Sequence, residues 1–566
     1  MGKGYCCRHD PIVRKIFLTM LVPTILMNLT TAIGSMADTM IIGHYLDDAA
    51  LSVVTFATPI YMVINTLAAL FAVGGCIAMS IDVGKGEKDT ANLAFSMSVE
   101  LMILFGVLLM LVGLFFSGNV TAWLGAGEDV FESVRQYAGI VLLGAPIFIL
   151  NIGIAFFVRN DGRPTLAMVG MLLSIFVDII LNVVFVGVMD LGVPGAAYST
   201  VLGQLVSVLV IGSHFLSSKN TLRFRLTCNA MVLRIVKNGA GAALHFVYQF
   251  LTILIINRFL AKLEGTDGIV VYTVVFNLST VSLSVFEGIS QTIQPMIGNY
   301  YGEKSYKNIK QTMYLAFVSI LVICGSVTLA LETAPELVPM AFGLDDDLLI
   351  LASAEAVRIY AAAMIMTTVN VVIGYYLQST EHSSMAAVLI SLRCFVIFLA
   401  ATIILGILFG MNGVWAAYAV AEVLSFVICV CILLVKRRKL TKSGTEVDLL
   451  LLETAIEQSI ECYTCRCREQ DALDFQKTVL ARLEQHPELP DHLLKDAQAY
   501  LARLSQCITH KKGTYIELEL NAAEKKIMIR DNLDHTVLQS DMQASVQHGS
   551  KADYGPVLGW NRICLR

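Results

Sequence analysis

The stretch Pro23–Tyr45 reads PTILMNLTTAIGSMADTMIIGHY and contains one carboxylate, Asp38. It lies in an apolar run that is long enough to cross a bilayer, for which a helix needs ~20 residues. An ionisable side chain inside such a span costs roughly 2.5–3.5 kcal/mol on insertion scales. Because that cost is seldom carried without a partner or a function, the stretch predicts a membrane protein in which Asp38 has a role.

Composition supports this prediction. The 566 residues are 56% hydrophobic and 15% charged, and the mean hydropathy is +0.70. A soluble domain has about 25% charged residues. The net charge of -5 is small and the basic residues lie in short loops, so we expect no nucleic-acid partner. The expected fold class is an all-α polytopic membrane protein embedded in a lipid bilayer.

Twelve apolar runs predict twelve transmembrane helices. They lie near residues 12–46, 51–80, 93–116, 138–158, 166–189, 193–216, 239–261, 269–298, 312–334, 355–378, 385–410 and 413–435. Lys and Arg gather in alternate loops, including Arg159, Lys304 and KRRK at 436–439, whereas the other loops are often acidic, as at Asp345–Asp347. Basic loops stay in the cytoplasm. We therefore expect a multi-pass protein of the plasma (cell) membrane with both termini cytoplasmic.

The membrane part repeats itself. The triplet Gly-Glu-Lys occurs at 86–88 and at 302–304, and GVPGAAYSTVLGQLVS (192–207) aligns with GMNGVWAAYAVAEVLS (410–425). An even number of spans per half makes such a repeat parallel. The prediction is two pseudo-symmetric six-helix lobes and a cytosolic domain, with these bounds: N-terminal lobe 1–216, cytoplasmic inter-lobe loop 217–238, C-terminal lobe 239–437 and cytosolic α+β domain 445–566.

Several motifs in this order resemble the MATE (multidrug and toxic compound extrusion) transporters of the MOP superfamily. They are Pro23 with Asp38–Gly43, Ala57–Pro59, Gly74–Gly75, Gly195–Ala197, and Gly288–Gln291 with Gln294–Pro295, and the resemblance covers about residues 10–437. It implies a secondary-active multidrug efflux antiporter and not an enzyme. Such a protein exports organic, here by expectation cationic, compounds by alternating access in exchange for protons or sodium, with no other cofactor.

Two carboxylates are expected at similar depth in the first lobe. Asp38 lies nine residues before Asp47, or roughly 13 Å from the end of its span, and Asp178 lies twelve residues before Asp190, or roughly 18 Å. Carboxylates close together in a low dielectric resist ionising together, so the pair is suited to hold a proton or a cation. The alternative is two buried Asp side chains with a structural role.

The family resemblance implies that Asp38 and Asp178 couple ion binding to drug release. Ser174 and Asn182, one turn before and after Asp178, complete this expected ion-coupling set. No metal-binding residues are predicted.

The expected substrate-binding residues lie in the second lobe. They are His245, Gln249, Asn277, Glu287 and Gln291. Glu287 is placed to attract a cationic substrate; the alternative is a structural hydrogen bond, for example with Gln249. Arg393 and Glu422 are expected to form a structural ion pair in the same lobe.

The C-terminal part predicts a small α+β domain. We expect a helix over about 445–485, a second helix capped by Asp491 and ending near 509, and paired strands at 514–520 and 525–531. Cys462, Cys465 and Cys467 form CxxCxC, but a zinc site usually needs four ligands. A metal site is therefore not expected here.

The same domain is faintly similar to histidine-kinase-type ATPase domains of anti-sigma kinases. The similarity rests on the helix ending at His510, the strand before Asp531 and VLGW at 557–560. Gln506 stands where a magnesium-binding Asn is needed, and Leu533-Asp534 replace a required glycine. We expect a non-catalytic, regulatory domain.

Two other functions fit parts of the sequence. One is a lipid-linked saccharide flippase of the same superfamily, although such a cavity tends to be cationic. The other is a membrane sensor whose spans serve the cytosolic domain. No P-loop of the form GxxxxGK[ST] occurs, so an ATP-driven pump lacks its motor. The expected partners are small organic molecules and the bilayer, and a monomer is expected.

Overall fold

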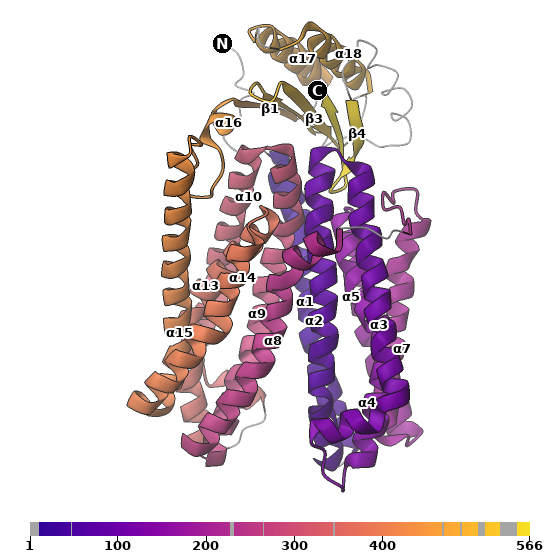
Figure 1. Ribbon diagram of the computed structural model, residues 1–566, viewed down its shortest axis with the longest axis vertical. Helices are drawn as coiled ribbons and strands as arrows, with labels where there is room; N and C mark the ends of the chain where they lie inside the picture. Colours follow the sequence, from indigo (N-terminus) through magenta and orange to yellow (C-terminus); the bar gives the residue numbers. More distant parts are fainter. Residues whose placement is uncertain are drawn as a thin grey trace.

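The computed structural model describes residues 11–46, 48–226, 231–263, 265–342, 346–466, 469–486, 489–507, 515–532 and 552–565. Long helices run roughly parallel, and a small sheet with two helices lies across one end of them (Figure 1). We call that end the tail side and the opposite end the far side, and residues 445–566 the tail domain. The expected fold class, a helical membrane bundle with a small C-terminal sheet domain, is confirmed.

The first lobe contains the helices of residues 11–216. They are α1 (Pro11–Tyr45), α2 (Asp48–Lys85), α3 (Lys88–Leu124), α4 (Phe131–Leu143), α5 (Ala145–Asn160), α6 (Pro164–Asn182), η1 (Val183–Val188), α7 (Gly192–Gly212) and η2 (Ser213–Leu216).

The second lobe follows and starts inside the predicted inter-lobe loop. Its helices are α8 (Met231–Leu263), α9 (Gly265–Glu303), α10 (Tyr306–Ser319), η3 (Ile320–Cys324), α11 (Gly325–Thr333), α12 (Leu337–Ala341), α13 (Asp347–Ser379), α14 (Ser383–Ser391), η4 (Leu392–Val396) and α15 (Ile397–Lys442).

The described helices are sufficient for a multi-pass membrane protein. Ten helical stretches are long and apolar enough to cross a membrane, and α4 with α5, bent by 46°, adds an eleventh if the two form one span. The stretch Ser383–Lys442 has 60 residues and holds two of the predicted apolar runs. Within it, α15 breaks at Gly410, whose φ of 63° suits a residue without a Cβ. With that break counted, the described stretches accommodate the twelve predicted runs.

Glycines let the two lobes meet backbone to backbone at the tail side. A Cβ on Gly84 of α2 would lie 2.1 Å from the Asn299 oxygen of α9, and a Cβ on Gly302 of α9 would lie 2.1 Å from the Ile81 oxygen of α2. Nearer the middle of α2, Gly74 makes an equivalent approach to α8. Away from the sheet the helices of the two lobes diverge (Figure 1). The lobes therefore meet mainly in their tail-side halves.

The tail domain is a five-stranded antiparallel sheet in the order β1-β2-β3-β5-β4. Its elements are α16 (Thr454–Gln458), β1 (Ile460–Arg466), α17 (Glu469–Leu483), α18 (Asp491–Cys507), β2 (Tyr515–Asn521), β3 (Lys526–Asp531), β4 (Ala552–Val557) and β5 (Trp560–Leu565). Helices α17 and α18 cover the face of the sheet that points away from the membrane helices (Figure 1).

Two of the tail predictions are confirmed and one is wrong. The helix beginning at Asp491 and the two strands near 515–531 are present. The single helix expected over 445–485 is interrupted by β1, which pairs with β2 from Ile460 opposite Asn521 to Arg466 opposite Tyr515. The partner strand lies about fifty residues further along, so local helical periodicity is overridden by a distant pairing.

Candidate functional site

The two predicted carboxylates of the first lobe lie together. Asp38 on α1 and Asp178 on α6 are close enough for their carboxyl groups to interact directly. Asn182 donates from Nδ2 to Asp38 Oδ1 at 3.1 Å. Asp178 is 6% exposed, and its Oδ1 has no hydrogen-bond partner among the described residues. A carboxyl group donates a hydrogen bond only when protonated, so this contact suits a shared proton.

Close packing of α6 against α7 fixes Asp178 in this position. A Cβ on Gly203 of α7 would lie 2.6 Å from the Ser174 oxygen and 3.0 Å from Asp178 Cβ, so a larger residue would push the helices apart. The approach brings Ser199 and Thr200 of α7 within reach of the Asp178 carboxylate. The first lobe thus surrounds one carboxylate with hydroxyl groups.

Ser174 and two tyrosines lie near the two carboxylates. Ser174 is buried one turn before Asp178, but among the described residues no hydrogen bond joins its hydroxyl to either carboxylate. Tyr61 of α2 and Tyr137 of α4 share a hydrogen bond of 3.1 Å, and both lie within electrostatic range of the carboxylates. Sequence reasoning missed these tyrosines, although a polar atom inside an apolar span is the signal that marks them.

Gln291 lies at the contact between the lobes rather than on an open substrate wall. It is 3% exposed and exchanges hydrogen bonds of 3.2 Å with Asn28 of α1 in both directions. Its Nε2 also lies 3.5 Å from Glu287 Oε2. Since Asn28 belongs to the first lobe, Gln291 connects the predicted substrate residue Glu287 with the other lobe.

Arg159 was expected in a basic loop, and that prediction is wrong. Arg159 is the next-to-last residue of α5 and is fully buried. Its guanidinium donates to Gln291 Oε1 at 2.8 Å and to Gln294 Oε1 at 3.3 Å, and it lies over the Phe156 ring. Lobe packing covers this end of α5, so a residue that reads as a loop cation is an inter-lobe hydrogen-bond donor.

The expected ion pair of the second lobe is confirmed. Arg393 Nε lies 2.9 Å from Glu422 Oε1, and Asn370 donates to Glu422 Oε2 at 2.6 Å. His245 lies beside the neighbouring Cys394, with Nδ1 3.6 Å from Sγ. Glu287 also lies within electrostatic range of Arg393.

The remaining predicted substrate residues do not join this group. Gln249 on α8 and Asn277 on α9 are half-buried. Within the described part of the chain no hydrogen bond links either one to Glu287, so the structural alternative, a Gln249–Glu287 bond, has no counterpart there. The five predicted residues thus divide into a group near Arg393, a contact between lobes, and two separate helix positions.

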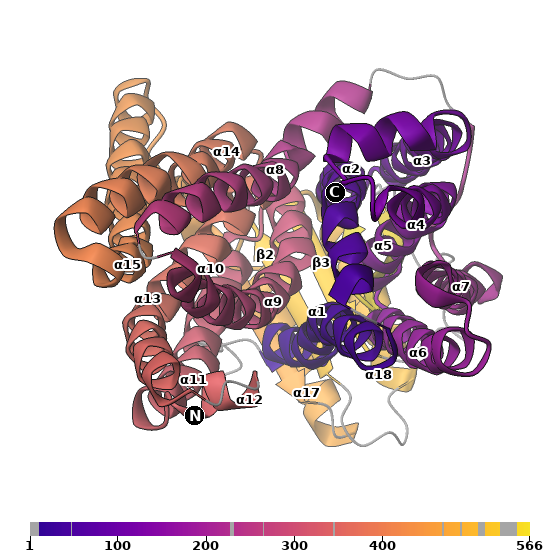
Figure 2. The ribbon, with the colours of Figure 1, turned by 90° about the horizontal axis from the view of Figure 1, so that it is seen from below.

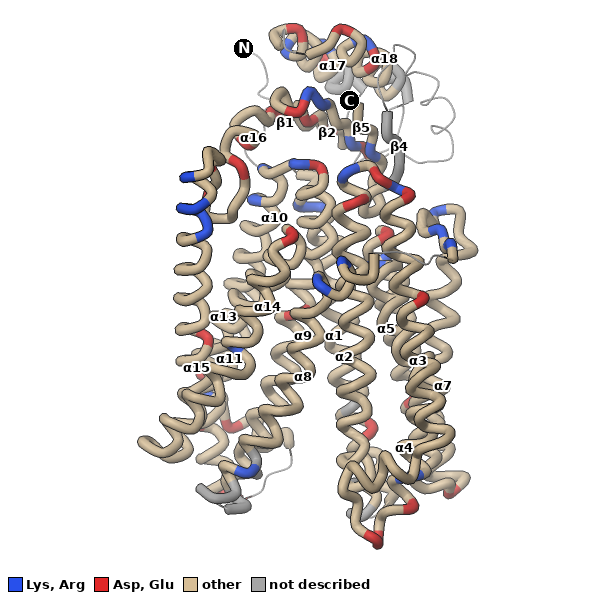
Figure 3. Tube along the Cα trace, viewed as in Figure 1, with Lys and Arg blue, Asp and Glu red and all other residues tan. Residues whose placement is uncertain are grey.

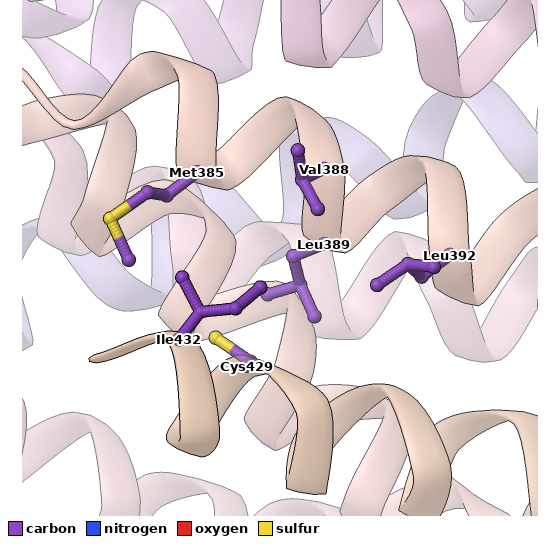
Figure 4. Close-up of a pocket in the computed structure, with 6 residues that line it drawn as sticks. All are labelled: Met385, Val388, Leu389, Leu392, Cys429 and Ile432. Carbon is purple, nitrogen blue, oxygen red and sulfur yellow. The ribbon is translucent and has the colours of Figure 1, made fainter. Parts of the chain in front are cut away.

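A small apolar pocket between α14 and α15 is not a substrate site (Figure 4). Its volume is about 10 Å³, roughly the space of a single water. The residues that line it are all apolar or weakly polar: Met385, Val388, Leu389, Leu392, Cys429 and Ile432.

The cysteine motif of the tail domain is divided between the two faces of β1. The ligand atoms of Cys462, Glu517 and Glu519 lie within 4.8 Å of one another. Arg530 already binds both carboxylates. Cys465 belongs to the opposite, apolar face, and Cys467 lies outside the described residues. The absence of a metal site therefore stays a prediction.

Comparison with known proteins gives full-length relatives of the membrane part. The chain is 25% identical over 432 residues to the multidrug export protein MepA of Staphylococcus saprophyticus, covering 75% of this chain and 94% of that protein. It is also 25% identical over 448 residues to MepA of Staphylococcus aureus, covering 78% and 98%.

Solved structures share the fold. One is a multidrug resistance MATE family transporter of the MOP superfamily in an outward-facing conformation, with a TM-score of 0.70, 20% identity, and coverage of 74% of this chain and 94% of that one. Another is a MOP superfamily transporter from Pyrococcus furiosus, described as having a binding pocket of reverse polarity. Its TM-score is 0.69 at 19% identity, covering 76% and 96%.

The family profile named MatE matches two segments, residues 23–184 and 242–404, one in each lobe. The matches begin 219 positions apart (242 − 23), in agreement with the internal repeat, and end before the tail domain. Because the two segments make up more than half of the chain, the protein belongs to the MatE family.

Proposed function

We propose that this protein is a secondary-active multidrug exporter that exchanges organic cations for protons. The observation that carries the proposal is the close approach of Asp38, which is half-buried, to Asp178, which is buried. Such a pair binds a proton most tightly when water is excluded and loses it when the cavity hydrates. The multidrug export activity of the MepA relatives supports the same class of substrate.

The transport path is proposed to open alternately to the two sides of the plasma membrane. The lobes pack closely at the tail side through glycines and diverge at the far side, which corresponds to an outward-open arrangement if the tail domain is cytosolic. The Lys and Arg residues near the tail-side helix ends support that orientation (Figure 3). Rocking of the lobes about the central contact would expose the site to each side in turn.

The charges near the lobe contact favour an exporter over a lipid-linked saccharide flippase. A pyrophosphate needs accessible cations, but Arg393 is paired with Glu422 and Arg159 is enclosed by glutamines. Glu287 and the two first-lobe carboxylates provide negative charge instead. These groups suit a cationic substrate.

Transport in proteoliposomes tests the proposal. Ethidium movement would be measured with an imposed pH gradient, an imposed sodium gradient, or neither. We expect the pH gradient alone to drive export, and Asp38→Asn or Asp178→Asn to abolish the drive while protein yield stays normal. If only the sodium gradient drives export, the coupling ion is sodium and not the proton. Undiminished coupling in both variants would refute the carboxylate site.

A further inference from the structure

The second face of the tail sheet is charged and buried. Residues on one face of the strands, such as Leu518, Ile529 and Ile563, pack against α17 and α18. The alternate positions carry Glu517, Glu519, Arg530 and Arg562, all 4% exposed or less. Charged side chains are almost never fully buried unless paired. This face must therefore have a partner surface, and the tail-side ends of the membrane helices provide it.

The first half of that partner surface is the end of α9 in the second lobe. Glu303, the last residue of α9, has its side chain fully buried between two arginines of the sheet. Arg562 Nη1 lies 2.8 Å from Glu303 Oε1, and Arg530 Nη2 lies 2.5 Å from Oε2. Arg530 also lies 2.8 Å from Glu517 on the neighbouring strand. The α9 end is thus joined to the sheet by desolvated ion pairs.

Arg562 also reaches the first lobe. Its Nη2 donates to the Val83 carbonyl at 2.9 Å and its Nη1 to the Gly84 carbonyl at 3.3 Å, in the last turn of α2. Carbonyls at a helix C-terminus lack intrahelical partners and carry partial negative charge. One guanidinium therefore bonds the ends of α2 and α9, which belong to different lobes. Viewed from the far side, β2 and β3 lie behind the seam between these helices (Figure 2).

The turn between β4 and β5 makes a second contact with the first lobe. A Cβ on Gly162, between α5 and α6, would lie 2.4 Å from the Gly559 nitrogen, so the two backbones touch. Leu558, 8% exposed, lines a cavity of about 80 Å³ together with Ser80 and Val83 of α2. The turn thus packs beside the same end of α2 that Arg562 binds.

The tail domain is held more firmly by the second lobe than by the first. It follows α15 directly in the chain, and Lys310 of α10 lies 2.8 Å from Asp448 and 2.6 Å from Glu457. Tyr376 of α13 donates to the Leu450 carbonyl at 2.7 Å. Contacts with the α2 end are fewer and consist of backbone carbonyls and apolar packing. If the lobes separate at this side, the α2 contact is the one that breaks at lower cost.

We propose that the tail domain is a clamp that holds the tail-side ends of α2 and α9 together, and that it releases α2 whenever the transport path opens to this side. The need for release rests on the proposed alternating-access function. The holding contact itself does not, because it is a property of the static structure. The clamp adds free energy to the closed state of this side and so shifts the balance between the two open states.

Two variants and one control test the clamp by hydrogen–deuterium exchange of the full chain in nanodiscs. Arg562→Met removes both carbonyl bonds and one ion pair. Leu558→Asn weakens only the apolar contact, and Asn tolerates the positive φ of 54° at this position. Arg482→Met is the matched control. Arg482 is an exposed residue of α17, the helix on the side of the sheet that points away from the lobes.

We expect exchange at residues 79–85 of α2 to accelerate by about tenfold in both test variants, since local opening there becomes easier. Exchange in Arg482→Met should equal that of the wild type. The clamp is refuted if Leu558→Asn leaves the α2 end at the wild-type rate while the sheet stays protected. It is equally refuted if Arg562→Met accelerates exchange only within the sheet.

Ethidium efflux tests the release step separately. With α2 loosened, Leu558→Asn should raise the initial rate, because less free energy is needed to separate the lobes. A loosened α2 end with an unchanged or slower rate would contradict release as part of the cycle. If neither the wild type nor any variant moves ethidium, the proposed function fails, and the exchange result still decides whether the clamp exists.

Discussion

The two lobes carry different charges on the same frame. The family matches begin 219 positions apart, and at that offset Asn151 of the first lobe corresponds to Asn370 of the second. Asn151 donates to Gln204, whereas Asn370 donates to Glu422. In both lobes an asparagine side chain thus donates a hydrogen bond to a neighbouring helix. The acceptor is the amide of Gln204 in the first lobe and the carboxylate of Glu422 in the second.

The charged residues of the two lobes also differ. In the second lobe Arg393 neutralises Glu422, whereas in the first lobe the two carboxylates Asp38 and Asp178 lie close together. The second lobe therefore contains an ion pair in which each charge stabilises the other, so both groups stay charged. The first lobe contains two like groups close together, to which we assign the proton in the proposed function. A buried charge is therefore suited to coupling when its partner cannot neutralise it.

Breaking the Arg393–Glu422 ion pair should change the stability of the protein most. Arg393→Met leaves the buried Glu422 carboxylate with the hydrogen bond from Asn370, and removing one member of a buried pair costs about 3–5 kcal/mol. We expect the free energy of unfolding in detergent to fall by that amount, with a clear loss of folded protein after heating. A loss of less than about 1 kcal/mol would mean that the pair is well solvated.

The double variant Arg393→Met with Glu422→Gln restores the first-lobe type of contact. The amide introduced by Glu422→Gln keeps the hydrogen bond to Asn370, and no buried charge is left. Replacing a whole buried ion pair is often neutral or stabilising. The unfolding free energy should return to within about 1 kcal/mol of the wild type, and no return would place the loss in the packing of Arg393 instead.

Replacing one of the two charged groups in the first lobe should raise the stability of the protein rather than lower it. In Asp178→Asn the new amide is able to donate to Asp38, so we expect stability to rise by about 1 kcal/mol. Proton-driven efflux should nevertheless fall by at least about tenfold, since the proposed proton site is lost. Ser174→Ala is the control, because its hydroxyl bonds neither carboxylate among the described residues. Equal loss of stability in both lobes would remove the contrast.

The first-lobe site is predictable because carboxylates are rare in apolar spans and depth follows from counting residues along a helix. Asp38, Asp178 and Asn182 come together in this way. Arg159 was not predictable, since an arginine at the end of an apolar run reads as a loop residue until the other lobe covers it. The strand β1 was missed for a related reason: its partner is fixed only by the fold of the complete domain.

The charged residues between the tail sheet and the end of α9 include Glu303, which is paired with two arginines, and Glu519, which has one oxygen without a partner among the described residues. Their response to pH should be weaker than the effects above. Burial raises the pKa of Glu519 to about 6, against the opposing effect of Arg530, and its Oε1 has no partner among the described residues. A carboxyl group whose pKa is raised on docking favours docking when protonated, so this contribution is lost as pH rises from the ordinary value of 4.5 through about 6.

Exchange at the start of α10, corrected for its intrinsic pH dependence, should therefore be slower at pH 5 than at pH 7, by about fivefold. Glu519→Gln should remove that difference and leave the slow rate at both pH values. If Glu519→Gln keeps the full difference in exchange rate between pH 5 and pH 7, another group is responsible for the titration. Glu519 would then be a carboxylate neutralised by an arginine, like Glu422.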